Sequence, residues 1–152
     1  MNSRIKRIVT TTAATTVGLA GLLFVGAGPA AAASASQAAA ICGSGYTPLN
    51  SYGYGVGPLD SPVSIIYVSY KNGTDCVVNI KVADVGTPTA MYTYVNGPNA
   101  SWGGNADDGS EDVGSYSYYA GPVYTYAPSE CIYWGGGFNA TFTDDYGPGY
   151  CK

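Results

Sequence analysis

The sequence contains no histidine among its 152 residues. Histidine is the commonest general base, the usual partner of a nucleophilic serine or cysteine, and the commonest metal ligand, so its absence removes most routes to hydrolytic and metal-assisted catalysis. A serine–lysine dyad would have to use Lys71, which lies in a predicted turn, or Lys81, which lies on a strand face expected to meet water. We therefore expect no catalytic residues and no cofactor, and we predict that the protein is not an enzyme.

The N-terminal segment has the pattern of a cleaved signal peptide. A short basic region precedes an uncharged apolar run, Ile8–Val25, which is followed by small residues. Cleavage is expected after Ala33 or Ala35, and no later stretch approaches the roughly 20 apolar residues that a spanning helix requires. The sequence thus predicts a secreted protein, extracellular or at the cell surface and without a membrane anchor. The predicted organisation is a signal peptide (1–33), a flexible arm (34–41) and one secreted β domain (42–152).

Positive charge is scarce once the signal peptide is removed. Three lysines and no arginine remain against all ten acidic residues, which gives a net charge of −7. Nucleic acids and anionic membrane surfaces are bound through lysine and arginine, so both are excluded as partners. About 118 residues remain, which is enough for one domain but too few for two cores.

All four cysteines lie in the exported part of the chain. An even number of cysteines in a secreted domain predicts two disulfides. A metal site is disfavoured because the chain has no CxxC spacing and no histidine. Three pairings remain open, and we favour Cys42–Cys76 with Cys131–Cys151, which would hold the first and last thirds of the domain separately.

Glycine, tyrosine, valine and threonine dominate the secreted part, a composition typical of short strands joined by tight turns. Val63–Tyr70 and Cys76–Val82 flank an Asn-Gly turn and predict a β-hairpin, in which Asn79 and Lys81 face water. Val63–Tyr70 is also uncharged, so it predicts self-association if its edge is left uncovered. Turn signals every 8–12 residues or so predict an all-β fold, a single small antiparallel sandwich or barrel-like domain. The later strand candidates are Met91–Val95, Val113–Tyr119, Val123–Tyr126, Cys131–Trp134 and Phe138–Thr143, whereas Tyr46–Pro58 reads as a loop or a short irregular strand.

The tyrosines suggest a binding surface. All fifteen lie in the secreted part, and four pairs are two residues apart. Residues i and i+2 of a strand share a face about 6.6 Å apart, and flat rings at that spacing can stack on a sugar or a protein surface. The alternative is that tyrosine simply suits strands and stabilises cross-strand pairs. A cell-wall glycan or a surface protein is the expected partner of this candidate face, which comprises Tyr92, Tyr94, Trp102, Tyr116, Tyr118 and Trp134.

An acidic segment, Gly103–Asp112, is predicted to be a solvated loop. Its oxygen-rich side chains suggest a calcium site, but the spacing does not match an EF-hand loop, so no metal site is predicted. Two alternative functions follow from the same segment: carboxylates held across a cleft could hydrolyse a glycan, and a rigid loop could inhibit a protease. The calcium and hydrolase hypotheses both rest on Asp107, Asp108, Glu111 and Asp112.

Several short motifs resemble one known family. They are Tyr119-Ala-Gly-Pro-Val-Tyr124, Cys131-Ile-Tyr-Trp-Gly-Gly136, Cys42-Gly-Ser-Gly-Tyr46, Cys76-Val-Val78 and the late Cys151. Together they resemble the spore-associated protein A family, small secreted proteins of Streptomyces and related actinobacteria. The resemblance implies export, association with the spore or cell surface, and no established catalytic activity. It supplies no catalytic or ligand-binding residues.

Overall fold

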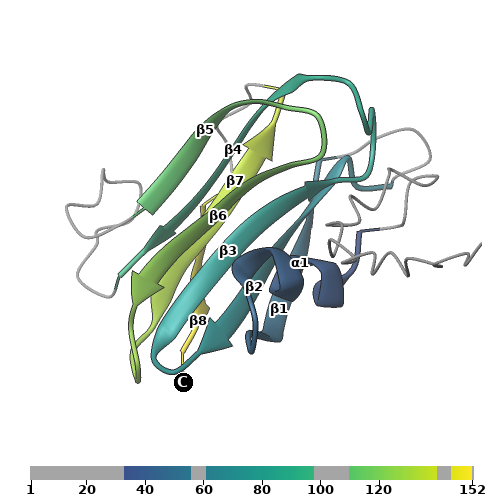
Figure 1. The fold of residues 1–152 in the computed structure, drawn as a ribbon. Coiled ribbons are helices and arrows are strands. Elements are labelled where there is room, and N and C mark those ends of the chain that lie inside the picture. Colours follow the sequence, from purple (N-terminus) through teal and green to yellow (C-terminus); the bar gives the residue numbers. More distant parts are fainter. Residues whose placement is uncertain (1–32, 56–60, 98–109, 140–144, 152) are drawn as a thin grey trace, which may run out of the picture.

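The computed structural model describes residues 33–55, 61–97, 110–139 and 145–151. These residues form one helix and eight strands, arranged as two four-stranded antiparallel sheets that pack face to face (Figure 1). The predicted all-β fold is therefore confirmed, and it takes the sandwich form rather than the barrel.

The chain crosses repeatedly between the two sheets. It passes from the first sheet to the second after β3, returns after β5, and crosses again after β6. In spatial order, the first sheet contains β1 (Thr47–Tyr54), β2 (Ser64–Lys71), β3 (Thr74–Lys81) and β6 (Tyr119–Tyr126). The second sheet contains, in spatial order, β5 (Ser110–Tyr116), β4 (Thr89–Asn96), β7 (Ile132–Phe138) and β8 (Asp145–Tyr150), and its β4 and β5 pack against β6 of the first sheet.

The β2–β3 hairpin forms where the Asn-Gly turn predicts it. Lys71 pairs with Thr74, and the turn residues Asn72 and Gly73 have φ values of 48° and 91°. Positive φ at both positions is what a two-residue turn needs to match the twist of its strands. Strand β2 lies between β1 and β3, so Val63–Tyr70 does not offer an open edge, and the condition for self-association through this segment is not met.

Other boundaries differ from those predicted. Of the two alternatives for the glycine- and tyrosine-rich segment after Cys42, it forms a strand, the eight-residue β1, which pairs along β2 with an irregularity between Pro48 and Asn50. Phe138 ends β7 instead of beginning a strand, and β8 starts later, at Asp145. Strand β5 begins at Ser110, inside the segment expected to be a loop.

Apolar side chains from both sheets form the core between them. Fully buried valines and isoleucines of β2 and β3 meet Val95 of β4 and Ile132 of β7. Burial of each such side chain stabilises the fold by about 1.5–3 kcal/mol, which makes this layer the main source of stability.

Two polar residues expected to face water lie instead inside the sandwich. Asn79 is 0% exposed and Lys81 is 3% exposed. The amide of Asn79 donates to the carbonyl oxygens of Tyr92, at 3.0 Å, and Gly137, at 3.1 Å. Asn79 therefore joins β3 of one sheet to β4 and β7 of the other.

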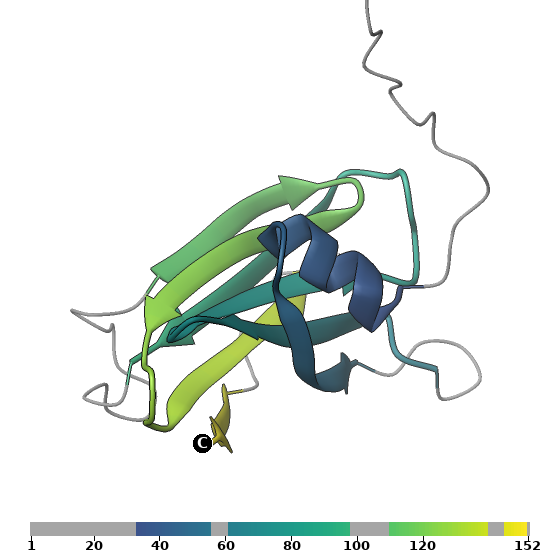
Figure 2. The same ribbon diagram turned by 60° about the horizontal axis from the view of Figure 1, so that its bottom comes forward.

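Asn79 and Lys81 lie inside because a helix covers the opposite face of the first sheet. The segment predicted to be a flexible arm forms α1 (Ala35–Cys42), which lies across the first sheet (Figure 2). Its Ala38 and Cys42 pack on Tyr67, Val78 and Ile80. Ser34 caps the helix by accepting from the backbone N–H of Gln37. Along β2 and β3, both faces of the first sheet are thus buried, one by the second sheet and one by α1. No described helix is long and apolar enough to cross a membrane.

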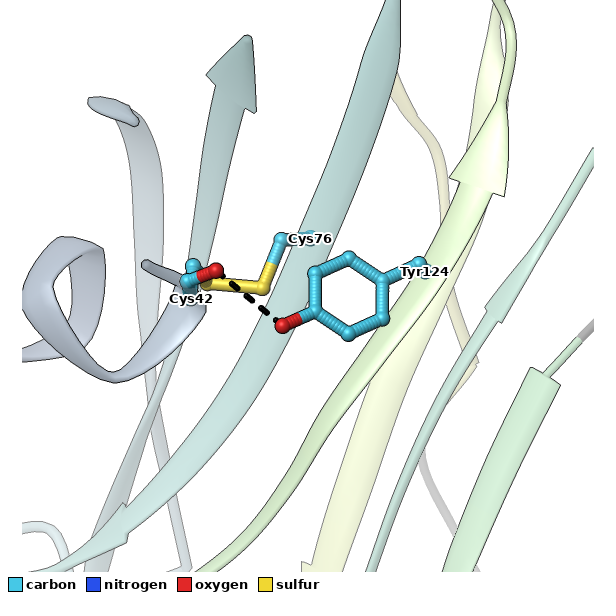
Figure 3. Close-up of a disulfide and its surroundings, with 3 residues drawn as sticks. All are labelled: Cys42, Cys76 and Tyr124. Atoms are coloured by element: carbon cyan, nitrogen blue, oxygen red, sulfur yellow. Dashed lines mark hydrogen bonds between the residues drawn. A yellow bond between two sulfur atoms is a disulfide. The ribbon is translucent and has the colours of Figure 1, made fainter. Parts of the chain in front are cut away.

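The two disulfides join the pairs favoured from sequence. Cys42–Cys76 links the end of α1 to β3, and Cys131–Cys151 links the start of β7 to the residue after β8. The hydroxyl of Tyr124 on β6 donates to the carbonyl oxygen of Cys42 at 3.1 Å, beside the first disulfide (Figure 3). One covalent and one hydrogen bond therefore hold α1 against the sheet.

Candidate functional site

The acidic residues that the structure describes do not form a site. Glu111 and Asp112 are adjacent in β5, so they point to opposite faces: Glu111 is exposed, whereas Asp112 turns inward. Asp112 accepts a hydrogen bond from the hydroxyl of Tyr116 and another, of 2.7 Å, from the backbone N–H of Gly121. Asp107 and Asp108 lie outside the described residues, within which no cluster of three or more metal-ligating side chains occurs. Glu111 and Asp112 therefore cannot act together on a calcium ion or across a glycosidic bond.

The same hydrogen bond determines the role of Tyr116. Donation to Asp112, together with partial burial and the carboxylate's charge, raises the pKa of Tyr116 to about 12. Through Asp112, Tyr116 is tied to Gly121 at the edge of β6. Tyr116 thus closes the side of the sandwich between β5 and β6 and does not join a ligand-binding face.

Lys81 and Ser64 occupy paired positions of β3 and β2, which makes Ser64 the serine to consider for a serine–lysine dyad. The ammonium of Lys81 instead donates to the carbonyl oxygen of Thr87 at 2.5 Å and to the hydroxyl of Thr89 at 2.7 Å. Burial lowers the pKa of Lys81, an effect that Asp84 partly opposes. Since Ser64 is 0% exposed, no substrate can reach its hydroxyl, and the pair is structural.

The outer face of the second sheet carries two parallel tyrosine rings. Tyr92 and Tyr94 lie on β4, and their ring centroids are 6.4 Å apart with 10° between the ring planes. Met91, Thr93 and Val95 of the same strand are buried, so the alternation of β4 turns the two tyrosines outward. We call Tyr92 and Tyr94 the tyrosine platform.

A glycine in the neighbouring strand supports this platform. Tyr92 pairs with Gly137 of β7, and a Cβ atom on Gly137 would lie 2.0 Å from Cε1 of Tyr92. The ring therefore rests directly on the glycine backbone, which no larger residue would allow. The carbonyl oxygen of Tyr92 is also held from inside by Asn79. Ring and backbone are both fixed, so the platform is preorganised.

The side chains beside the platform are those of β5. Val113 pairs with Tyr92 and is 56% exposed, while the exposed Glu111 pairs with Tyr94. One end of the platform is thus extended by an apolar side chain, and the other is next to a carboxylate.

The other predicted members of the binding face do not join the platform. Trp134 is 2% exposed and belongs to the core between the sheets. Tyr118 is 49% exposed but lies in the turn between β5 and β6, and Trp102 lies outside the described residues. The candidate face therefore reduces, within the described chain, to Tyr92 and Tyr94.

The chain is similar to a known protein over most of its length. It is 37% identical over 130 residues to Spore-associated protein A of Streptomyces coelicolor, and the match covers 80% of this chain and 75% of that protein. The chain belongs to the spore-associated protein A family. No family model matches it, and no solved structure does so either.

In this member of the spore-associated protein A family, the recognisable motifs build the fold around the platform. Tyr119–Tyr124 forms most of β6, and Cys131–Gly136 carries the second disulfide into β7. The three glycines Gly135–Gly137 lie inside β7. A glycine inside a strand commonly marks a close approach of another group, and this rule would have pointed to Gly137.

Proposed function

We propose that this protein is a non-catalytic component of the spore or cell surface and that it binds wall glycan through the tyrosine platform. Its membership of the spore-associated protein A family supports the location. The single observation that carries the binding role is the parallel, glycine-supported pair of Tyr92 and Tyr94 on an outer sheet face.

The chemistry of the platform favours a neutral glycan. Aromatic faces stack on the apolar C–H faces of sugar rings, and tyrosine hydroxyls add hydrogen bonds to sugar hydroxyls. Glu111 beside Tyr94 can accept hydrogen bonds from a sugar but repels anionic groups. The predicted secreted chain also carries a net charge of −7, which disfavours polyanions such as phosphate-rich wall polymers.

The test is retention of the purified, oxidised secreted domain on isolated spore walls and vegetative cell walls. The decisive variant is Tyr92→Ala/Tyr94→Ala, and the matched control is Tyr126→Ala, which removes a 71% exposed tyrosine from the other sheet. If each ring contributes about 1 kcal/mol, the double variant should bind roughly 30-fold more weakly. The control should bind like the wild type.

Competition with free sugars identifies the kind of partner. Retention that a neutral sugar reverses supports the proposal. Retention that no sugar reverses, but that still requires the platform, indicates a protein partner instead. If the protein is not retained at all, the surface role is wrong, and inhibition of a panel of secreted proteases becomes the next function to measure.

A further inference from the structure

Tyrosine is the oxidisable side chain that the described surface offers to solvent. Met91 and Trp134 are each 2% exposed, and no described cysteine is free. The sequence has no histidine. A one-electron oxidant that reaches this surface would therefore react with tyrosine.

The two most exposed tyrosines of the described residues lie at the two ends of one strand. Tyr126, the last residue of β6, is 71% exposed, and Tyr118, just before its start, is 49% exposed. Tyr119 beside Tyr118 is 37% exposed, as is Tyr52 on β1. Seven residue steps along a strand separate the two ends by about 23 Å. Figure 1 shows β6 running the length of the sandwich, so these two groups face different surroundings.

The surroundings of Tyr126 keep its ring at the surface. A Cβ atom on Gly73 would lie 2.6 Å from Cε2 of Tyr126, so the ring rests on the tight turn between β2 and β3 and cannot sink inward. Tyr124, two residues before it, is 40% exposed, but its hydroxyl is engaged with Cys42. Within the described residues, the most exposed phenols thus lie at the two ends of β6, with Tyr126 at one end and the adjacent Tyr118 and Tyr119 at the other.

We propose that this protein is a substrate for oxidative cross-linking between copies of the chain through these tyrosines. A peroxidase using hydrogen peroxide would remove one electron and one proton from each of two phenols. The two phenoxyl radicals would join through a carbon–carbon bond between ring positions ortho to the oxygens, and a shift of each ring proton to its oxygen would restore both phenols. The peroxide takes up the two electrons and two protons and becomes two molecules of water.

Two reactive ends make the chain bifunctional. A molecule with one reactive phenol can only dimerise, whereas one with phenols at both ends can extend into covalent chains. The expected product is therefore a polymer of folded domains, resistant to reducing agents because the new bonds are not disulfides. This cross-linking does not depend on glycan binding, so it stands or falls separately from the tyrosine platform.

The experiment treats the purified, oxidised protein with a haem peroxidase and hydrogen peroxide. Products are resolved on denaturing gels after reduction, and dityrosine is detected by its fluorescence. We expect a ladder of oligomers from the wild type and mainly dimers from Tyr118→Phe/Tyr119→Phe. The triple variant that also carries Tyr126→Phe should lose most of the oligomers and most of the fluorescence, although Tyr52 and Tyr124 remain exposed.

Tyr54→Phe is the matched control, because it removes the hydroxyl of a tyrosine that is only 5% exposed. It should give the wild-type ladder. Phenylalanine retains the ring in every variant, and circular dichroism checks that each remains folded. A wild-type protein that stays monomeric, or a triple variant that still forms the full ladder, would overturn the proposal. A full ladder from Tyr118→Phe/Tyr119→Phe would overturn the two-ended arrangement.

Discussion

Removal of the Asn79 side chain should weaken the sandwich more than a typical polar substitution does. The side-chain amide lies at the centre of the molecule, where it donates to the carbonyl oxygens of Tyr92 and Gly137. Since these two residues pair with each other in the second sheet, a single side chain of the first sheet holds both β4 and β7. Asn79→Ala therefore removes the polar link that joins β3 to both β4 and β7.

The magnitude can be worked from these contacts. The two hydrogen bonds contribute about 1 kcal/mol each, and the cavity left by the amide costs about 1 kcal/mol more. Oδ1 of Asn79 is buried without a protein partner, so its removal returns about 1 kcal/mol. Asn79→Ala should thus lower the free energy of unfolding by about 2 kcal/mol, a large share of the stability of a small domain.

Urea unfolding with both disulfides intact measures this change. Asn79→Asp should be worse than alanine at neutral pH, because it places a carboxylate against two carbonyl oxygens in a buried site. Burial would raise the folded-state pKa of that carboxyl. The Asn79→Asp variant should therefore be most stable at low pH and lose stability as the pH rises through that folded-state pKa. Ser115→Ala, at an exposed position of β5, is the control and should change stability by less than about 0.5 kcal/mol. If Asn79→Ala behaved like the control, the proposed link between the sheets would be refuted.

Three further changes test other parts of the structure. Replacing Cys42 and Cys76 by alanine removes a disulfide with a sequence separation of 34. In the same urea assay this change should lower the free energy of unfolding by about 4 kcal/mol. A loss below about 1 kcal/mol would show that hydrogen bonds and packing alone hold α1. Asp112→Asn should return the pKa of Tyr116 from about 12 toward 10, measured as an earlier phenolate transition in an ultraviolet titration. Because that pKa is raised in the folded state, the interaction stabilises the wild type below pH 10 and its contribution is lost as the pH rises through about 12; an unchanged titration of the variant would contradict the assigned hydrogen bond. Gly137→Ala should displace the first ring of the tyrosine platform and weaken retention on walls while the domain stays folded, whereas wild-type retention would show that the ring's position is unimportant.

Alternation along a strand could identify which residues share a face but not which face lies inside. In β3 it correctly grouped Cys76 with Val78, and Asn79 with Lys81. The apolar group was expected in the core and the polar group in water, which would hold for a sheet with one buried face. In the structure α1 buries the first group and the second sheet buries the other, so the polar side chains became interior hydrogen-bonding groups.

The sequence contains a local signal for α1, but the alanine-rich composition of the segment obscures it. Alanine-rich sequence precedes α1 and continues into it, and this composition by itself predicts a flexible arm. Ser34 followed three residues later by Gln37 is a capping-box pattern that marks a helix start, and Ser34 does cap the helix. The spacing of i and i+2 along a strand predicts that Tyr92 and Tyr94 share a face, as they do in the tyrosine platform. The same spacing cannot predict that Trp134 is buried beneath this sheet, because that burial depends on the tertiary fold.

The most direct test of the proposed function is the retention of Tyr92→Ala/Tyr94→Ala on isolated spore walls, measured beside the wild type and Tyr126→Ala. We predict that the wild type and the control are retained and are released by a neutral sugar, while the double variant stays folded and binds roughly 30-fold more weakly. Equal retention of all three proteins would contradict the assignment of glycan binding to the tyrosine platform.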